Sequence, residues 1–204
     1  MRTEAEFRAL LAEDRCWDAG VQATYEATGE PREDAILQNR EELIGLAEFI
    51  AAENIRSFLE IGVWTGRLVS TLHRIFRFDL VAAVDHGYAQ RLGLPLHLPP
   101  DARFLAADSD SAAYREWRAL LPAFDLVFID ANHGYRAVRR DFELNRALPH
   151  RFLAFHDIAG QGRATAGVRR LWAELGGRKR EIVAPHRELG LDHSTMGIGV
   201  WSER

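Results

Sequence analysis

Cysteine and an excess of positive charge are what this chain of 204 residues most plainly lacks. Its single cysteine, Cys16, cannot form an intramolecular disulfide, which fits a reducing compartment, and we expect an ordinary, partly buried side chain. The 26 basic residues are outnumbered by 30 acidic ones, which gives a formal net charge of −4. Because non-specific nucleic-acid binding needs a dense basic surface, this composition argues against a nucleic-acid partner.

Long hydrophobic runs are missing as well. The longest apolar runs have only the length of a strand, so we expect no transmembrane helix and no membrane partner. The N-terminal stretch MRTEAEFRALLAEDR is charged throughout and lacks the apolar region of a secretory signal peptide. With 47% hydrophobic and 27% charged residues, the sequence predicts a cytoplasmic globular protein, long enough for one α/β domain and short for two.

The first 35 residues predict one or two amphipathic helices. Apolar side chains recur there at helical spacing, at Phe7, Leu10, Leu11, Trp17, Val21 and Tyr25. Residues 36–54 predict a clearer helix with one apolar face. We therefore divide the chain into an N-terminal helical extension, residues 1–35, and a main domain, residues 36–204. The extension is a candidate cap over the substrate, and simple packing against the sheet is the alternative.

From residue 57 onward, short apolar runs alternate with amphipathic helical stretches. The expected strands are Ser57–Ile61, Leu80–Val84, Arg103–Ala106, Asp125–Ile129, Phe152–Phe155, Glu181–Val183 and Gly197–Trp201. The expected helices between them include Leu68–Phe76, Ala112–Leu120, Tyr135–Leu148 and Ala166–Leu175. This alternation predicts an α/β fold with a Rossmann-like, doubly wound, mostly parallel seven-stranded sheet. In such sheets, ligands bind at the carboxyl ends of the strands.

The first expected strand ends in the pattern E-x-G-x-x-x-G, formed by Glu60, Gly62 and Gly66, and a helix follows at once. Gly62 permits a tight turn and a close ligand approach, and the helix N-terminus presents free N–H groups. These features are those of a nucleotide-binding turn, although a tight turn that binds no ligand would have the same sequence pattern. Trp64 stands where a G-x-G-x-x-G dinucleotide site needs glycine, and the chain has no Y-x-x-x-K. Both absences disfavour a nicotinamide-dependent oxidoreductase.

Acidic residues end the next two expected strands. Asp85 ends the second strand, where a carboxylate can accept hydrogen bonds from ribose hydroxyls. Asp108 and Ser109 end the third, the position for contacts with an adenine edge. The alternatives are that Asp85 caps a loop and that Asp108 and Ser109 cap the following helix.

The fourth and fifth expected strands bring carboxylates and imidazoles to the same edge of the sheet. Asp130 ends the fourth strand with His133 three residues later, and His156 with Asp157 ends the fifth. Converging carboxylates repel unless a cation compensates, so Asp130, His156 and Asp157 are candidate ligands of a divalent metal. Magnesium prefers carboxylate oxygens, whereas an imidazole also allows manganese, iron or zinc. The alternative is that the two aspartates cap helices and His156 is a packed core side chain.

His133 is the candidate general base of this group, acting beside Asp130. The unperturbed pKa of histidine is about 6.5, so its neutral form is available near physiological pH. The alternative is a loop histidine that only orders Asp130.

These residues resemble the class I S-adenosylmethionine-dependent methyltransferases. The likeness runs from about residue 38 to the C-terminus and rests on LEIGVWTG, AAVDHG, FIDANHGYRAVRRDFEL, AFHDI and GIGVW. The segments after the fourth and fifth strands are similar to the metal-dependent small-molecule O-methyltransferases of the macrocin and cephalosporin-biosynthesis type. That grouping often has an acidic ligand at the position of His156, so this chain departs from it there.

The resemblance implies a role for each matching position. Glu60 and Gly62 would lie against the methionine part of S-adenosylmethionine, with Gly66 supporting the turn. Asp85 would hold the ribose, and Asp108 with Ser109 would face the adenine. Asp130, His156 and Asp157 would hold Mg²⁺ or Mn²⁺, and His133 would lie near the acceptor hydroxyl. The last strand, GIGVW, would be antiparallel beside the fifth.

The expected function is therefore methyl transfer to a hydroxyl of a small molecule by a methyltransferase domain at residues 36–204. A metal-independent methyltransferase and a non-catalytic cofactor-binding or scaffold protein are the alternatives, because a fold alone does not establish activity. The segment 86–101 and the side chains of Trp17 and Tyr25 are candidates for selecting the acceptor, whose identity stays open. The two histidines of the segment 186–193 are expected at the surface. The sequence leaves open whether the chain forms a homo-oligomer.

Overall fold

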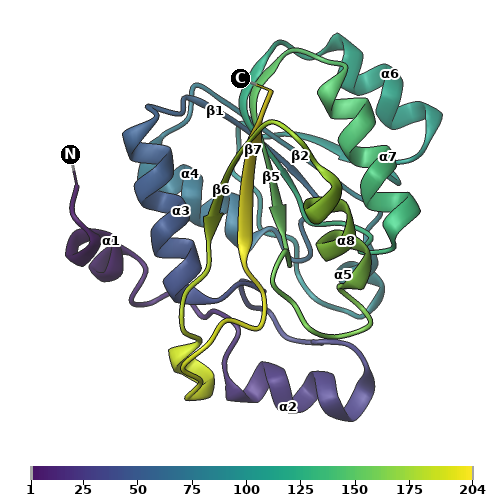
Figure 1. The fold of residues 1–204 in the computed structure, drawn as a ribbon. Helices are drawn as coiled ribbons and strands as arrows, with labels where there is room; N and C mark the ends of the chain where they lie inside the picture. The colour runs from purple at the N-terminus through teal and green to yellow at the C-terminus, as the bar shows by residue number, and fades with distance from the viewer. Residues whose placement is uncertain (1, 204) are drawn as a thin grey trace.

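A single seven-stranded sheet organises the chain, in the order β3-β2-β1-β4-β5-β7-β6. The computed structural model describes residues 2–203, and its ribbon is shown in Figure 1. The strands are β1 Ser57–Ile61, β2 Leu80–Asp85, β3 Arg103–Ala106, β4 Phe124–Ile129, β5 His150–His156, β6 Arg178–Ile182 and β7 Ile198–Ser202. The first five pair in parallel, whereas β7 is antiparallel to both β5 and β6. The predicted α/β sheet with an antiparallel last strand is confirmed.

The predicted and observed strand boundaries differ most at strand β6. It covers Arg178–Ile182, whereas the apolar pattern placed it at 181–183. In the described sheet β6 lies at an edge and pairs only with β7, so four of its five residues are exposed and charged. An edge strand of this kind leaves no apolar run in the sequence, and its charges discourage pairing with other chains.

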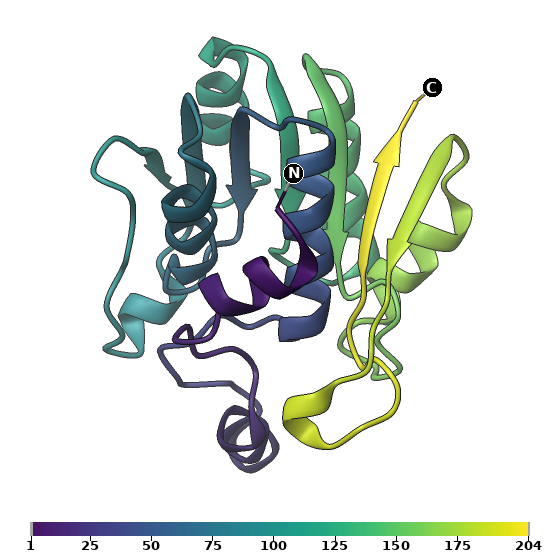
Figure 2. The ribbon, with the colours of Figure 1, turned by 90° about the vertical axis from the view of Figure 1, so that its left-hand side faces the viewer.

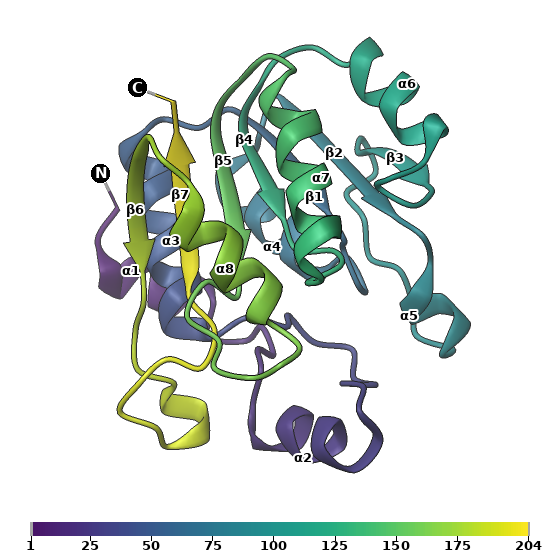
Figure 3. The same cartoon turned by 45° about the vertical axis from the view of Figure 1, so that its right-hand side comes forward.

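Helices cover both faces of the sheet. They are α1 Glu4–Leu10, α2 Ala19–Thr28, α3 Arg40–Ala52, α4 Arg67–Phe76, α5 Tyr88–Arg91, α6 Ala112–Leu120, α7 Tyr135–Arg146 and α8 Ala166–Glu174, with a 3₁₀ turn at Arg187–Leu189. Figure 2 shows α1, α3 and α4 over one face, and Figure 3 shows α7 and α8 over the other. Side chains alternate along β1, so that Phe58 packs in one core and Leu59 in the other.

Helix α3 begins later than the sequence pattern predicts. The expected helix started at residue 36, but α3 begins at Arg40 because the Asn39 side chain accepts a hydrogen bond from the backbone N–H of Glu41 and caps the helix. Residues 36–38 therefore run as irregular chain past the strand ends. A second difference is α5, a single helical turn within the segment 86–101 that the sequence did not predict.

The N-terminal segment is tied to the main core. Phe7, Leu11 and Cys16 are fully buried in the same cluster as Phe58. Cys16 is thus completely rather than partly buried, and burial raises the pKa of its thiol to about 12, which keeps it an unreactive thiol. Helix α2 lies apart from this core, below the strand ends (Figure 1). The division of the chain at residue 35 stays a prediction. No helix among residues 2–203 is long and apolar enough to cross a membrane.

One carboxyl group is buried on the α7 side of the sheet without a full set of partners. Asp141 is 1% exposed, and its Oδ2 has no hydrogen-bond partner among the described residues. Burial raises the pKa of Asp141 to about 6, although Ser109 and Arg140 oppose that shift. The folded state therefore holds the neutral acid more readily than the unfolded chain does.

We predict that Asp141→Asn stabilises the fold at high pH. A raised folded-state pKa contributes stability that is complete below the unfolded value of 3.8 and is lost as the pH rises through about 6. At pH 8 the variant should therefore unfold at a higher urea concentration, by up to roughly 3 kcal/mol in free energy of unfolding, and the gain should shrink toward pH 4. Glu116→Gln, an exposed charge on α6, is the control. A gain that is equal at pH 4 and pH 8 would contradict this account.

Candidate active site

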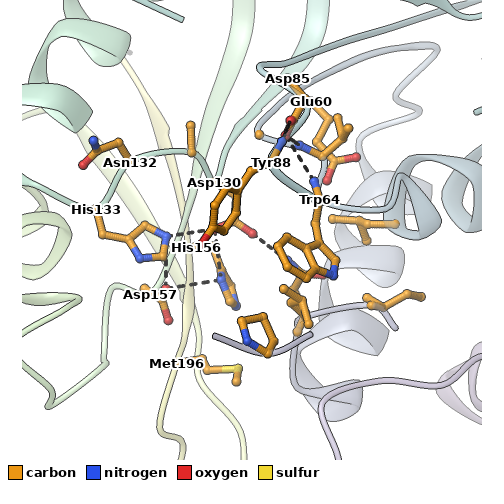
Figure 4. Close-up of a pocket in the computed structure, with 18 of the residues that line it drawn as sticks. Glu60, Trp64, Asp85, Tyr88, Asp130, Asn132, His133, His156, Asp157 and Met196 are labelled. Atoms are coloured by element: carbon orange, nitrogen blue, oxygen red, sulfur yellow. Dashed lines mark hydrogen bonds and ion pairs between the residues drawn. The ribbon is translucent and has the colours of Figure 1, made fainter. Parts of the chain in front are cut away.

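A cavity of about 650 Å³ lies at the carboxyl ends of the central strands. The turn after β1, the ends of β2, β4 and β5, and residues from α2 and the segment 31–38 all contribute walls. Figure 4 shows Trp64 and Asp85 on one side of this space and His133 and Asp157 on the other. The cavity is where a doubly wound sheet binds its ligands, and every candidate site residue from the sequence lines it except Gly66.

The turn after β1 depends on Gly62. Its φ is +82°, and a Cβ there would lie 2.6 Å from the Cα of Ala131, at the end of β4. Only glycine therefore lets β1 and β4 approach this closely at the cavity. Trp64 follows with a φ of +52°, and its indole N–H donates to the Glu33 carbonyl at 2.9 Å. The aromatic side chain thus ties the segment after α2 to the turn.

Asp85 holds this turn and the start of the segment 86–101 together. Its Oδ2 accepts from the backbone N–H of Val63 at 2.9 Å and of Trp64 at 3.3 Å. Its Oδ1 accepts from Gly87 at 2.6 Å and Tyr88 at 3.4 Å. The carboxylate is only 8% exposed, so any ribose hydroxyl has to share it with these backbone donors.

Asp108 and Ser109 line the cavity at the end of β3. Helix α6 takes its N-cap from Ser111, whose side chain accepts from the backbone N–H of Tyr114. Neither Asp108 nor Ser109 is therefore used as the cap of α6, which was the alternative interpretation of this pair.

Glu60 lies at the floor of the cavity, 2% exposed, and its Oε2 has no hydrogen-bond partner among the described residues. Burial raises the pKa of Glu60 well above its usual range, and the nearby carboxylates of Asp130 and Asp85 raise it further. A side chain of this kind gains most from a positively charged or hydrogen-donating ligand.

Two carboxylates and two imidazoles meet where β4 and β5 end. Nε2 of His133 lies 3.2 Å from Oδ1 of Asp130 and 3.4 Å from Oδ2 of Asp157. Nδ1 of His156 lies 3.3 Å and 3.6 Å from the same two oxygens. The sequence predicted this convergence, and the dashed lines in Figure 4 mark it. Asp157 has a φ of +64°, a backbone conformation that aspartate tolerates better than most residues.

The carboxylates and imidazoles of this group stabilise each other's charged forms. Burial lowers the pKa of His156, but the carboxylates of Asp130 and Asp157 outweigh burial and raise it to about 10. Burial likewise opposes the rise in the pKa of His133 that Asp130 and Asp157 cause. Burial would raise the pKa of Asp130, yet the two imidazoles hold it well below its usual range. The group thus balances two negative carboxylates with imidazole N–H donors.

Gln38 belongs to this site, and the sequence analysis missed it. Its side-chain N–H donates to Oδ2 of Asp130 at 2.6 Å, and the residue is 3% exposed. Gln38 comes from the irregular segment before α3, which the sequence pattern assigned to that helix. Its only sequence signal is its place just before the Asn39 cap, which by itself indicates no contact with β4.

Asp130, His156 and Asp157 can each offer one ligand atom to a metal ion, and these atoms all lie within 4.8 Å of one another. Two carboxylate oxygens and one imidazole nitrogen fit a divalent cation in distance and in donor type. His133 touches the same oxygens but does not belong to this set of three.

The remaining wall is aromatic and apolar, and it includes Trp17, Tyr25, Ile36 and Met196. The rings of Trp17 and Tyr25 pack edge to face with centroids 5.6 Å apart. Of the segment 86–101, His86 and Tyr88 reach the cavity.

Contrary to the expectation from the sequence, one of the two histidines of the segment 186–193 is not at the surface. His193 is exposed as predicted, but His186 is fully buried. Its backbone bonds to Leu191 and His193 close a turn of the segment, and both of its ring nitrogens are buried without a hydrogen-bond partner among the described residues. Burial lowers the pKa of His186.

We predict that Gly62→Ala disrupts the fold and the cavity far more than Gly93→Ala does. Both glycines have a φ of +82°, so both variants pay the cost of a left-handed alanine, about 1–2 kcal/mol. A Cβ at Gly93 meets nothing within 4 Å, whereas one at Gly62 meets the backbone after β4. Urea unfolding of both variants separates backbone strain from the clash. Equal losses of stability would show that the close approach of β1 and β4 does not constrain Gly62.

The comparisons with known proteins agree with this geometry. Residues 59–158 match a family described as "Methyltransferase domain". The chain is similar in fold to an O-methyltransferase from Bacillus cereus in complex with S-adenosylhomocysteine, with 14% identity, a TM-score of 0.59 and 97% of each chain covered. It is also similar to the O-methyltransferase TomG from Streptomyces achromogenes, involved in tomaymycin synthesis and bound to S-adenosylmethionine. There the identity is 15%, the TM-score 0.55 and the coverage 99% of this chain and 100% of that one.

A third similar structure is a putative caffeoyl-CoA O-methyltransferase from Staphylococcus aureus, with 14% identity, a TM-score of 0.59 and coverage of 98% of this chain and 99% of that one. No curated protein matches the sequence significantly. The matched residues run from within β1 to just past the end of β5, and so include Glu60, Asp85, Asp130 and Asp157. Residues 59–158 thus match a methyltransferase domain, and the described chain has the fold of the class I S-adenosylmethionine-dependent methyltransferases.

Proposed function

We propose that this protein transfers the methyl group of S-adenosylmethionine to a hydroxyl oxygen of a small molecule, with help from a divalent metal ion and a histidine base. One observation carries the proposal. The Asp130–Asp157 carboxylate pair, bridged by His133, lines the same cavity as the glycine turn after β1.

The cofactor would occupy the side of the cavity formed by β1, β2 and β3. Glu60 would attract the positively charged methionine end, with Gly62 and Gly66 shaping the turn around it. Asp85 would accept from the ribose, and Asp108 with Ser109 would contact the adenine. The buried, unpartnered Oε2 of Glu60 supports a cationic or hydrogen-donating ligand at this end.

The acceptor hydroxyl would lie at the other side, next to Asp130 and His133. A metal ion held by Asp130, His156 and Asp157 would supply Lewis acidity to that hydroxyl. The methyl carbon bonds to the acceptor oxygen as its bond to sulfur breaks, and the sulfonium becomes a neutral thioether. The protein has to align the two reactants and exclude water.

The hydroxyl proton would pass to His133. Nε2 of His133 faces two carboxylate oxygens, so we assign the ring proton to Nε2. Nδ1 is then the basic atom of the neutral ring, and the two aspartates fix the tautomer and orient the ring, as a carboxylate does in other histidine bases.

A small acceptor fits the shape and chemistry of the cavity. A volume of about 650 Å³ is typical of sites for small ligands, and its aromatic and apolar wall would hold an apolar body. The similar O-methyltransferase folds support oxygen as the methylated atom. Metal-independent transfer is the second candidate, because the imidazole of His156 already faces both carboxylates. Turnover that survives a chelator would favour it.

We predict that S-adenosylhomocysteine binds through its ribose hydroxyls to Asp85. Calorimetric titration should show that the 2′-deoxy analogue binds wild type about tenfold more weakly or worse, the cost of a lost hydrogen bond to a charged group. Asp85→Ala should bind both compounds weakly and to the same extent. Asp192→Ala, an exposed aspartate outside the cavity, should behave as wild type. Equal discrimination by wild type and Asp85→Ala would assign the ribose to another residue.

We predict that His133→Ala lowers turnover by about 10²–10⁴-fold, the usual size of a general-base contribution. Asp130 and Asp157 raise the pKa of His133 above 6.5, so its neutral form appears only at higher pH. The kcat/KM of wild type should therefore increase with pH as His133 loses its proton, and this limb should be missing in the variant. His193→Ala is the exposed control. An ascending limb that persists in His133→Ala would point to a different base.

A further inference from the structure

We propose that His156 makes the Asp130–Asp157 site selective for a divalent ion that readily binds imidazole nitrogen, such as Fe²⁺, Co²⁺ or Zn²⁺, over Mg²⁺ and Ca²⁺. The proposal rests on the metal site of the proposed function and names the ions that this site takes. It therefore disfavours Mg²⁺, one of the two ions expected from the sequence.

The donor atoms point to this class of ion. Nδ1 of His156 lies 3.3 Å from Oδ1 of Asp130 and 3.6 Å from Oδ2 of Asp157, so one nitrogen completes the set of three. Imidazole nitrogen suits Zn²⁺, Fe²⁺ and their neighbours, whereas Mg²⁺ and Ca²⁺ prefer ligands that are all oxygen.

Gln38 narrows the choice further. It donates at 2.6 Å to Oδ2 of Asp130, so Oδ1, the oxygen that His133 and His156 face, is the one left for a metal ion. Ca²⁺ takes six to eight oxygens and often binds carboxylates through both atoms. A carboxylate whose other oxygen is held by Gln38 favours binding through one atom, which suits a smaller ion with fewer ligands.

The surroundings of His156 keep its ring in place. It is 4% exposed at the end of a central strand, and its ring packs against Phe128 with centroids 6.4 Å apart. Its Nε2 is buried and has no hydrogen-bond partner among the described residues, so Nδ1 is the nitrogen left to face the carboxylates. An ion that enters between Asp130 and Asp157 meets this nitrogen.

The first test compares metal affinities of the full-length protein. Calorimetric titrations with Co²⁺ and Mg²⁺ are made on wild type and on His156→Asn, which replaces the nitrogen donor by an uncharged oxygen donor. The proposal predicts that wild type prefers Co²⁺ and that the preference falls at least about tenfold in the variant, mostly through weaker Co²⁺ binding. His193→Asn, exposed and outside the cavity, is the control. An unchanged preference, or no ion bound by wild type, would overturn the proposal.

A second test needs no variant, in case His156→Asn does not fold. When Nδ1 binds the metal, Nε2 carries the ring proton, and burial shields that proton from water. The proton NMR spectrum of the Co²⁺-loaded protein should then contain one strongly shifted, slowly exchanging resonance. Its absence in the loaded protein would overturn the role of His156 as a ligand.

Binding of S-adenosylhomocysteine, measured on the same samples without metal, separates the two claims. Cofactor binding without selective Co²⁺ binding would refute the selectivity and leave methyl transfer standing. Selective Co²⁺ binding without cofactor binding would refute methyl transfer and leave the metal selectivity standing.

Discussion

The convergence of Asp130 and Asp157 is the constraint on which the rest of the site depends. Parallel pairing of β4 with β5 places the two residues that follow these strands side by side. Two carboxylates this close and this buried would repel each other without nearby positive charge or N–H donors. His133, His156 and Gln38 provide those donors from three different segments of the chain.

The carboxylate pair also helps to position the segment before α3. Gln38 reaches Asp130 only because α3 begins at Arg40 and the residues before it run past the strand ends. Trp64 holds Glu33 of that segment, and Arg67 pairs with Asp34 at 2.6 Å. The segment before α3 is thereby fixed to the turn after β1 and to the carboxylate pair at once, and it closes one side of the cavity.

Much of this arrangement follows from the sequence because strand ends in a parallel sheet share one edge. That rule alone predicted that Asp85, Asp130 and Asp157 would meet at a cavity, and the apolar runs located most strands within one or two residues. Gln38 was not predictable, since its contact depends on where a helix cap falls and on a partner far along the chain. His186 is buried in a segment without a regular apolar pattern, and the charged edge strand β6 has no apolar pattern to reveal it.

The most direct test of the central claim is a crystal structure of the protein with S-adenosylhomocysteine. The account predicts that the nucleoside lies between Asp85 and Asp108, with the amino group of the ligand near Glu60. The thioether sulfur should then face the space beside Asp130 and His133, where the acceptor oxygen would lie. A sulfur atom that points away from these two residues, or a cavity without the ligand at saturating concentration, would contradict methyl transfer at this site.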